Sequence, residues 1–403
     1  MGEKTTELMA KADEHLIRVY NRFPVAFAGG KGMMLVDVEG KEYLDFASGI
    51  GVNAFGANDE EFTDAICDQV KRVCHTSNLY YHEPLAEAAQ RLSEVSGLDK
   101  VFFTNSGAEA IEGALKTAKR YYYNRTGKND DEVIAMRNSF HGRTVGSLSV
   151  TGTDAYRNPF YPLMGGVSFA DFNDLSSVEA AVTDRTCAII FEPLQGEGGI
   201  HPATQEFMDG VRKLCDEKNI LLIFDEIQCG LGRTGSFYTF QQYGVKPDIL
   251  TTAKALGGGL PVGAFVVTEQ VAANSLKPGD HGSTYGGNPL CTRAVAESLR
   301  LLSERNLPGH VKETAPYFEE KLEELTRKFS FVKEYRGMGY MQGLELDAAV
   351  SAGAVVKEAL SRGLILLTAE GNVVRMLPPL IAQKADFDRM EEILSGVLAD
   401  FAK

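Results

Sequence analysis

The chain has 403 residues, of which 44% are hydrophobic and 24% are charged. This length exceeds what one simple core supports, so we expect two domains, or one large domain with a smaller companion. The formal net charge of −14 argues against nucleic acids and membrane surfaces as general partners. Small anionic substrates stay possible because a pocket can be locally basic.

The cysteines and the first residues indicate a cytoplasmic protein. The six cysteines are scattered without a CxxC pair, which is typical of reduced, mostly buried thiols. The first residues are polar and helical and lack an apolar signal core. No run approaches the roughly 18 apolar residues that a membrane span needs.

The N-terminal part predicts a short helix and then a hairpin. In the segment GMMLVDVEGKEYLDF, apolar residues flank a turn at Glu39-Gly40. A helical stripe follows, which we expect to pack in the core; its members are Phe62, Ala65, Ile66, Val70 and Val73.

From about residue 57, short apolar runs alternate with helical segments. The runs are VFF (101–103), VIAM (133–136), CAIIF (187–191), LLIF (221–224), DIL (248–250) and GAFVV (263–267). This alternation predicts the α/β class, with a mostly parallel sheet covered by helices on both faces. The last hundred residues predict a smaller α+β domain, with amphipathic helices at 311–325 and 387–401 around the strand segments FVKEYRGMGYMQGLEL and VVRMLPPL.

Polar residues follow these runs, at the strand ends where open α/β sheets bind ligands. After VFF, Ser106 and Gly107 begin a helix. The free N–H groups there favour a phosphate, although Ser106 could also be an ordinary N-cap. After VIAM, Phe140 and Arg143 could stack on a flat ring and hold a carboxylate, or simply belong to a surface loop.

Acids and a lysine follow the next three runs. Glu192 and Glu197 lie in a Gly-rich loop after CAIIF, where they are either functional or merely solvated. Asp225, after LLIF, suits a protonated ring nitrogen, but an N-cap explains a lone aspartate equally well. Lys254, after DIL, lies among small uncharged residues, where a desolvated amine becomes a nucleophile. Taken alone, a surface lysine is the better interpretation.

The four strand-end features are more specific together than separately. Pyridoxal phosphate needs an anion site, a ring-stacking residue, a pyridinium partner and an amine at one edge of a sheet. The helix start carries neither GxGxxG nor a Walker pattern, so a dinucleotide or ATP is not indicated. The seven histidines show no HxH or HExxH spacing, so we expect no metal and interpret His141 as structural.

Longer motifs connect the chain to a known family. They are TNSGAEAIEGALKTAKR, NSFHGRTVGSLSVTG, EPLQGEGG, FDEIQCGLGRTG, DILTTAKALGGGLPVGA and HGSTYGGNPLC. In order and spacing they resemble the class III pyridoxal-phosphate aminotransferases over nearly the whole chain. Within that class, SNLYYHEP, NSFHGRT and QCGLGRTG are most similar to the acetylornithine aminotransferases.

The resemblance implies the type I fold of pyridoxal-phosphate-dependent transferases, and a homodimer with active sites at the interface. A large cofactor domain would span 57–305, and a small domain would combine the N-terminal segment 1–56 with 306–403. The implied reaction transfers the δ-amine of N2-acetylornithine to 2-oxoglutarate, a step of arginine biosynthesis. Succinylornithine, ornithine, N-succinyldiaminopimelate and 4-aminobutyrate are alternative donors. An aminomutase or racemase on the same fold, or a decayed non-enzymatic copy, is a weaker alternative.

The resemblance also implies a role for each matching residue near the cofactor. Lys254 resembles the Schiff-base lysine that moves a proton between substrate and cofactor, and Asp225 resembles the acid on the ring nitrogen. The other implied contacts are Phe140 and Ile227 on the two ring faces, Gln228 near the phenolic oxygen, Ser106, Gly107 and Ala108 around the phosphate, and Thr284 reaching the phosphate from the neighbouring subunit.

Four residues match the family's substrate contacts. Arg143 resembles the clamp for a substrate carboxylate, and Ser283 lies near the substrate. Arg375 resembles the arginine that binds the α-carboxylate of glutamate, and Glu197 resembles the acid that masks this arginine while the amine donor is bound. Such a pair serves a two-substrate cycle and argues against an isomerase. One departure bears on substrate detail, because many relatives carry Gly-His-x-His-Pro where this chain has the stretch 55–59, FGAND.

Overall fold

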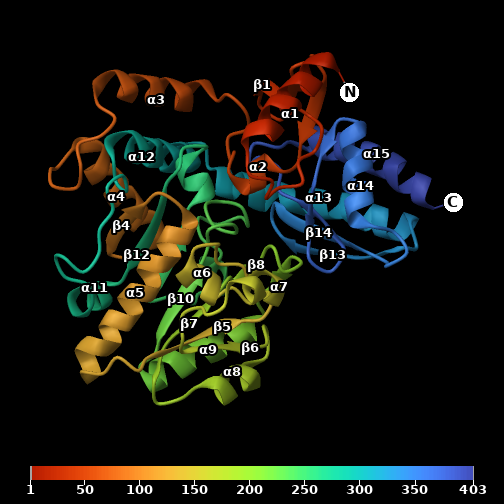
Figure 1. Cartoon of the computed structure of the whole chain (residues 1–403). Coiled ribbons are helices and arrows are strands. Elements are labelled where there is room, and N and C mark those ends of the chain that lie inside the picture. The colour runs from red at the N-terminus through yellow and green to blue at the C-terminus, as the bar shows by residue number, and fades with distance from the viewer. Residues whose placement is uncertain (1, 403) are drawn as a thin grey trace.

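The computed structural model describes residues 2–402. Seven strands form its central sheet (Figure 1): β4 (Lys100–Thr104), β5 (Glu132–Met136), β6 (Val167–Ala170), β7 (Thr186–Phe191), β10 (Leu221–Asp225), β11 (Ile249–Thr252) and β12 (Gly263–Val267). Their order across the sheet is β4-β12-β11-β10-β7-β5-β6. Only β12 runs antiparallel to its neighbours. Every predicted apolar run is a strand of this sheet; only β6, a short and half-buried edge strand, was not predicted.

Both faces of the central sheet are buried. Along β5, Val133 and Ala135 belong to a hydrophobic cluster that includes residues of α5 (Gly107–Thr126). The alternate residues Ile134 and Met136 belong to a second cluster, which includes residues of α9 (Gln205–Lys218). A strand covered on both faces needs apolar residues at every position. The predicted mostly parallel sheet, covered on both sides, is therefore confirmed.

The remaining helices surround this centre. They are α1 (Glu3–His15), α2 (Ser48–Gly51), α3 (Glu60–Arg72), α4 (Glu83–Ser96), α6 (Val145–Ser149), α7 (Asp154–Arg157), α8 (Leu175–Ala181), α10 (Phe240–Tyr243), α11 (Glu269–Asn274), α12 (Pro289–Glu304), α13 (Leu307–Lys328), α14 (Ala352–Ser361) and α15 (Lys384–Phe401), with short 3-10 turns η1 (Asn158–Phe160) and η2 (Lys254–Gly257). Within residues 2–402, none of the helices has the length and apolar character to cross a membrane.

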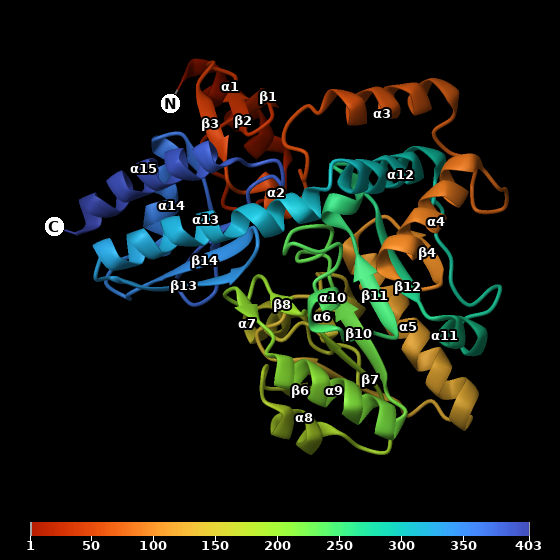
Figure 2. The same cartoon turned by 180° about the vertical axis from the view of Figure 1, so that it is seen from behind.

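The helix α3 lies at the periphery, over α12 (Figures 1 and 2). Its apolar stripe is only partly covered, since Val70 is 50% exposed and Val73 is 40% exposed. The expectation that the whole stripe packs in the core is therefore wrong. Periodicity correctly predicts a helix here, but α12 covers only one side of it.

The two ends of the chain fold together beside the central sheet (Figures 1 and 2). One four-stranded sheet contains β1 (Phe27–Lys31), β2 (Met34–Asp37), β3 (Glu42–Asp45) and β15 (Leu364–Ile365). The predicted hairpin is the antiparallel pair β2–β3, and β15 pairs in parallel with β3. The division into residues 1–56, 57–305 and 306–403 stays a prediction, which this pairing of N-terminal and C-terminal strands supports.

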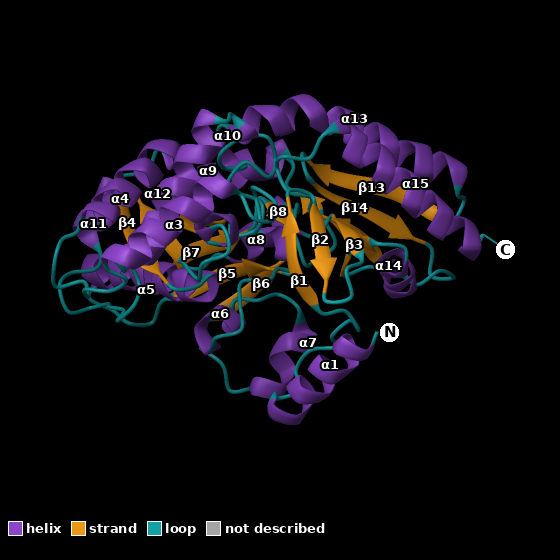
Figure 3. Ribbon diagram, turned by 90° about the horizontal axis from the view of Figure 1, so that it is seen from above, coloured by secondary structure: helices purple, strands orange, loops and turns teal. Residues whose placement is uncertain are grey.

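The C-terminal part has the predicted α+β character. Its own sheet contains β13 (Val332–Met338), β14 (Met341–Leu346), β16 (Leu367–Ala369) and β17 (Val373–Met376). The predicted amphipathic helices are α13 and α15, which pack against each other and lie beside β13 and β14 (Figure 3). A two-stranded ribbon of β8 (Leu194–Gln195) and β9 (His201–Pro202) completes the strands.

The stretch in which this chain departs from many relatives forms the turn into α3. Asp59 caps α3, because its carboxylate accepts a hydrogen bond from the N–H of Phe62 at 3.1 Å. The same carboxylate accepts a hydrogen bond from Arg305, at the end of α12, at 2.6 Å. This aspartate thus joins the start of α3 to the end of α12.

Candidate active site

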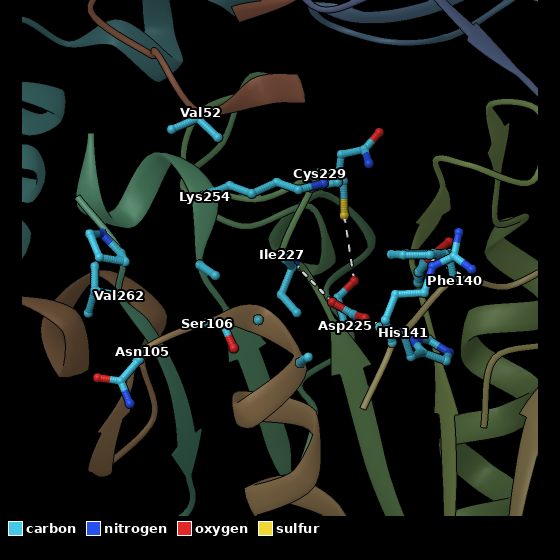
Figure 4. Close-up of a pocket in the computed structure, with 18 of the residues that line it drawn as sticks. Val52, Asn105, Ser106, Phe140, His141, Asp225, Ile227, Cys229, Lys254 and Val262 are labelled. Carbon is cyan, nitrogen blue, oxygen red and sulfur yellow. Dashed lines mark hydrogen bonds and ion pairs between the residues drawn. The ribbon is translucent and has the colours of Figure 1, made fainter. Parts of the chain in front are cut away.

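The carboxyl ends of the central strands border a cavity of about 450 Å³ (Figure 4). The predicted site residues that line it are Ser106, Gly107, Ala108, Phe140, Arg143, Asp225, Ile227, Gln228 and Lys254. They lie at the carboxyl ends of β4, β5, β10 and β11 or in the residues that follow these strands. The strand ends singled out by their polar residues therefore do meet at one place.

The start of α5 provides unpaired backbone donors. The hydroxyl of Ser106 caps the helix, since it accepts a hydrogen bond from the N–H of Glu109 at 3.2 Å. The N–H groups of Gly107 and Ala108 have no acceptor within the described chain. A side chain at Gly107 would come within 2.8 Å of Ile227, so glycine leaves room at this position. Free donors and the helix dipole together favour an anion such as a phosphate.

Asp225 is buried and held in one orientation. Its Oδ2 lies 2.7 Å from Nδ1 of His141. Its Oδ1 accepts hydrogen bonds from the N–H of Ile227 at 3.0 Å and from the hydroxyl of Thr251 at 3.3 Å. Figure 4 shows Asp225 between Ile227 and Phe140. A carboxylate fixed in this way, between an aliphatic and an aromatic side chain, suits the protonated nitrogen of a flat ring.

Glu192, to which the sequence pattern assigned no specific role, is a buried acid. Its carboxylate accepts hydrogen bonds from the N–H groups of Phe140 and Gly196, each at 3.2 Å. Burial raises the pKa of Glu192 well above its usual range, and the charge of Asp225 raises it further. Ligand atoms of His141, Glu192 and Asp225 lie within 4.8 Å of one another. Because His141 and Asp225 are hydrogen-bonded to each other, this arrangement does not require a metal.

Lys254 follows β11 and extends across the cavity (Figure 4). Its backbone φ is 50°, in the left-handed region that residues with a side chain rarely adopt and that is frequent at functional sites. Burial lowers the pKa of Lys254 to about 8; the charge of Glu197 opposes this shift and that of Arg375 adds to it. A substantial neutral fraction at physiological pH makes this amine a usable nucleophile.

The buried Arg375 and the partly buried Glu197 form an ion pair next to the cavity. Nη1 of Arg375, on β17, donates to Oε1 of Glu197 at 2.6 Å and to the amide oxygen of Gln228 at 3.0 Å. Nε of Arg375 is buried and has no partner within residues 2–402. Burial alone would raise the pKa of Glu197, but the charge and hydrogen bond of Arg375 outweigh burial and lower it. Glu197 is therefore ionised at neutral pH.

Arg143 lies at the same cavity without an acidic partner. Its guanidinium carbon is 3.8 Å from the centroid of the Tyr156 ring and 5.5 Å from that of Phe140. The side chain is exposed, and no ion pair or hydrogen bond joins it to another described residue. All of its N–H donors are therefore available to a ligand.

Four predicted residues do not line the cavity of their own chain: Glu197 and Arg375, which lie next to it as an ion pair, and Ser283 and Thr284. Ser283 is adjacent to it, since its hydroxyl accepts a hydrogen bond at 3.1 Å from Asn105, which does line the cavity. Thr284 is exposed, in the loop between α11 and α12. Conversely, Val52 lines the cavity without having been predicted. An isolated valine in the N-terminal segment carries no sequence signal, and only the fold brings it here.

Known proteins resemble this chain over nearly its whole length. The family Aminotransferase class-III matches residues 17–398. An acetylornithine aminotransferase of Methanocaldococcus jannaschii is 46% identical over 387 residues, which cover 96% of each chain. The ornithine aminotransferase of Toxoplasma gondii superimposes with a TM-score of 0.94 at 31% identity, over 99% of this chain and 96% of that one. An acetylornithine aminotransferase of Elizabethkingia anophelis gives a TM-score of 0.88 at 28% identity, over 98% and 99%.

The chain therefore belongs to the class III aminotransferases. It is a pyridoxal-phosphate-dependent aminotransferase with the type I fold, and the predicted family, fold and cofactor are confirmed. The chemistry of the cavity fits this cofactor, because it combines free backbone N–H donors, which suit a phosphate, with a fixed carboxylate, which suits a ring nitrogen, and an amine of lowered pKa, which suits an aldehyde.

Proposed function

We propose that this enzyme transfers the δ-amine of N2-acetylornithine to 2-oxoglutarate, giving N-acetylglutamate semialdehyde and glutamate, as in arginine biosynthesis. The observation that carries the proposal is that two arginines in different states lie at one cavity, Arg143 in its lining and Arg375 next to it. Arg143 is free of acids, whereas Arg375 is paired with Glu197. The identity of 46% to an acetylornithine aminotransferase supports the choice of donor.

The two substrates need different numbers of positive charges. N2-acetylornithine has one carboxylate and a blocked α-amine, so its carboxylate binds Arg143 while its δ-amine approaches Lys254. 2-Oxoglutarate has two carboxylates, of which the distal one binds Arg143 and the α-carboxylate binds Arg375. In the first half-reaction Glu197 neutralises Arg375, and in the second it moves aside. A bidentate arginine–carboxylate contact then orients the keto acid.

We assign the cofactor contacts to the residues that line the cavity. The N–H groups of Gly107 and Ala108, with Ser106, bind the phosphate. Phe140 and Ile227 bracket the ring, and the remaining ring contacts are Asp225 at the nitrogen and Gln228 near the phenolic oxygen. Pyridoxal phosphate supplies an electron sink for the carbon that bears the amine. Lys254 holds the cofactor and, once released by the substrate, takes and returns the proton at that carbon.

We further propose a homodimer with active sites at the interface. Thr284 is exposed outside the cavity of its own chain, and the segment before α4 exposes Leu79, Tyr80 and Tyr81. Large exposed apolar side chains of this kind mark contact surfaces. A second copy on this surface would receive Thr284, with Ser283 beside it, at its own phosphate site. We also propose a cytoplasmic location, which the six free cysteines support.

A panel of amines tests the donor. The holoenzyme is mixed with N2-acetylornithine, succinylornithine, N-succinyldiaminopimelate, ornithine or 4-aminobutyrate without 2-oxoglutarate, and the absorbance of the bound cofactor is followed through one turnover. We expect the fastest change with N2-acetylornithine. A faster change with ornithine or 4-aminobutyrate would contradict the proposed donor. Formation of an isomer of the donor without any keto acid would indicate an aminomutase or racemase instead.

A further inference from the structure

Tyr156, on α7, lies outside every motif that connects the chain to its family, yet its ring stacks on Arg143. The guanidinium carbon of Arg143 is 3.8 Å from the centroid of the Tyr156 ring. The rings of Tyr156 and Phe140 meet edge to face, with centroids 5.9 Å apart and an interplanar angle of 85°. Arg143 thus contacts two aromatic rings that also contact each other.

An aromatic ring and a carboxylate bind a guanidinium group in different ways. The face of the ring attracts the positive charge and supports the flat group, but it accepts none of the N–H donors. A carboxylate partner would occupy these donors and cancel the charge. Stacking on Tyr156 therefore restricts the orientation of Arg143 while its donors remain free for a substrate.

The helix α7, which carries Tyr156, is anchored to the central sheet. Arg157, the next residue along α7, is buried, and its guanidinium carbon lies 4.0 Å from the centroid of the Phe169 ring on β6. Arg157 also pairs with Asp154 at the other end of α7. Because α7 is anchored in this way, Tyr156 is held in place rather than carried by a free loop.

We propose that Tyr156 is a positioning residue that orients Arg143 toward the substrate carboxylate and so sets the preference for substrates with a carboxylate at that position. The inference rests on the proposed function, in which Arg143 binds the carboxylate of N2-acetylornithine and the distal carboxylate of 2-oxoglutarate. It predicts that Tyr156 contributes to the recognition of the carboxylate but not to the chemistry of the amine.

Matched substrates separate these two effects. N-acetylputrescine has the amine, chain and acetyl group of N2-acetylornithine but lacks its carboxylate. We expect Tyr156→Leu to raise KM for N2-acetylornithine about five-fold, the order of one stacking contact, with kcat unchanged and with kcat/KM for N-acetylputrescine unchanged. Tyr156→Phe keeps the ring face and should behave like the wild type. Equal losses with both amines would overturn the proposal, because they would indicate a general structural role.

A double-mutant cycle adds a second test. When Arg143→Ala is already present, Tyr156→Leu should cause no further loss with N2-acetylornithine, because both changes remove the same contact. Independent, multiplying losses would contradict the proposal. If Tyr156→Leu does not fold, Tyr156→Met removes the ring with a similar side-chain volume and replaces it in both tests.

The acceptor half-reaction distinguishes failure of this proposal from failure of the proposed donor. 2-Oxoglutarate has a distal carboxylate and pyruvate does not, so Tyr156→Leu should raise KM for 2-oxoglutarate and leave pyruvate unaffected. If the wild type does not use N2-acetylornithine, the donor is wrong, but this comparison still decides the role of Tyr156. If 2-oxoglutarate and pyruvate are affected equally, the role of Tyr156 is wrong whatever the donor is.

Discussion

The two arginines at the cavity are prepared for a carboxylate in opposite ways. Arg375 is buried on β17, and its charge is compensated by Glu197 and Gln228. Arg143 is exposed and rests on the faces of Tyr156 and Phe140. A buried guanidinium needs compensation for the solvation it has lost, whereas an exposed one does not. The charge of Arg375 is therefore available to a substrate only when Glu197 moves away, whereas the charge of Arg143 is always available.

This difference explains how one cavity can serve two substrates with unequal charge. The carboxylate position common to both is served by the arginine that carries no acid. The position that only the keto acid fills is served by the arginine with a removable partner. The ion pair between Arg375 and Glu197 thus serves to select substrates. Its contribution to the stability of the fold follows from the burial of Arg375.

The largest contrast is expected when each arginine is removed in turn. Arg375→Ala leaves the partly buried Glu197 without its ion-pair partner, which we expect to lower the free energy of unfolding by about 3 kcal/mol, the lower end of the range for a broken buried pair. It should also slow the half-reaction with glutamate by about 10³-fold, the order of a lost buried charge contact. Arg143→Ala should change stability by less than about 0.5 kcal/mol, because its side chain is exposed and has no acidic partner. Denaturant unfolding and single turnovers with glutamate measure both effects.

The order of the two variants should reverse when binding of the donor is measured. Arg143→Ala is expected to raise KM for N2-acetylornithine, whereas Arg375→Ala leaves binding of this donor nearly unchanged. Similar losses of stability in the two variants, or similar losses with the donor, would remove the distinction between the arginines.

A smaller effect is expected when only Glu197, the acid that neutralises Arg375, is replaced. Glu197→Gln keeps the shape of the side chain but leaves the charge of Arg375 permanently available. We expect single turnovers with glutamate to become faster relative to those with N2-acetylornithine, by about ten-fold for the loss of one charge–charge contact in a partly buried site. If the ratio of the two half-reactions stays at its wild-type value, Glu197 does not act as a mask.

The predictable part of this site is the part that local sequence pattern controls. Asp225 directly follows the buried run LLIF and Lys254 comes shortly after the run DIL, and a parallel sheet places such residues at one edge. Their meeting could therefore be predicted before any resemblance was considered. The pair joins Arg375 on β17 to Glu197 in the turn between β8 and β9, 178 positions away, so only the resemblance to a family could imply it.

Other features depend on packing that no pattern records. Tyr156 is a single aromatic residue in a short helix, and nothing near it in the sequence shows that it lies against Arg143. The apolar stripe of α3 is a second example. Its spacing predicts an apolar helix face, but it does not predict which element covers that face. Val70 and Val73 remain exposed for that reason.

The smallest expected effect is on the titration of Lys254. Burial lowers the pKa of this amine to about 8, and the charge of Glu197 is the main influence that opposes burial. Glu197→Gln removes this influence, so the pKa should fall below about 8 and the neutral amine should persist at lower pH. Arg143 is not among the charges that shift Lys254 strongly, so Arg143→Ala should leave the pKa near its wild-type value.

The pH dependence of cofactor uptake by the apoenzyme measures this difference. Only the neutral amine of Lys254 reacts with the aldehyde of pyridoxal phosphate, so the rate of uptake rises as pH increases through the pKa of the lysine. The titration of the free cofactor is common to all three proteins and cancels when their profiles are compared. We expect the midpoint of Glu197→Gln to lie at lower pH than those of the wild type and of Arg143→Ala. Equal midpoints in all three proteins would mean that the ion pair of Arg375 acts on the substrate alone and not on the lysine.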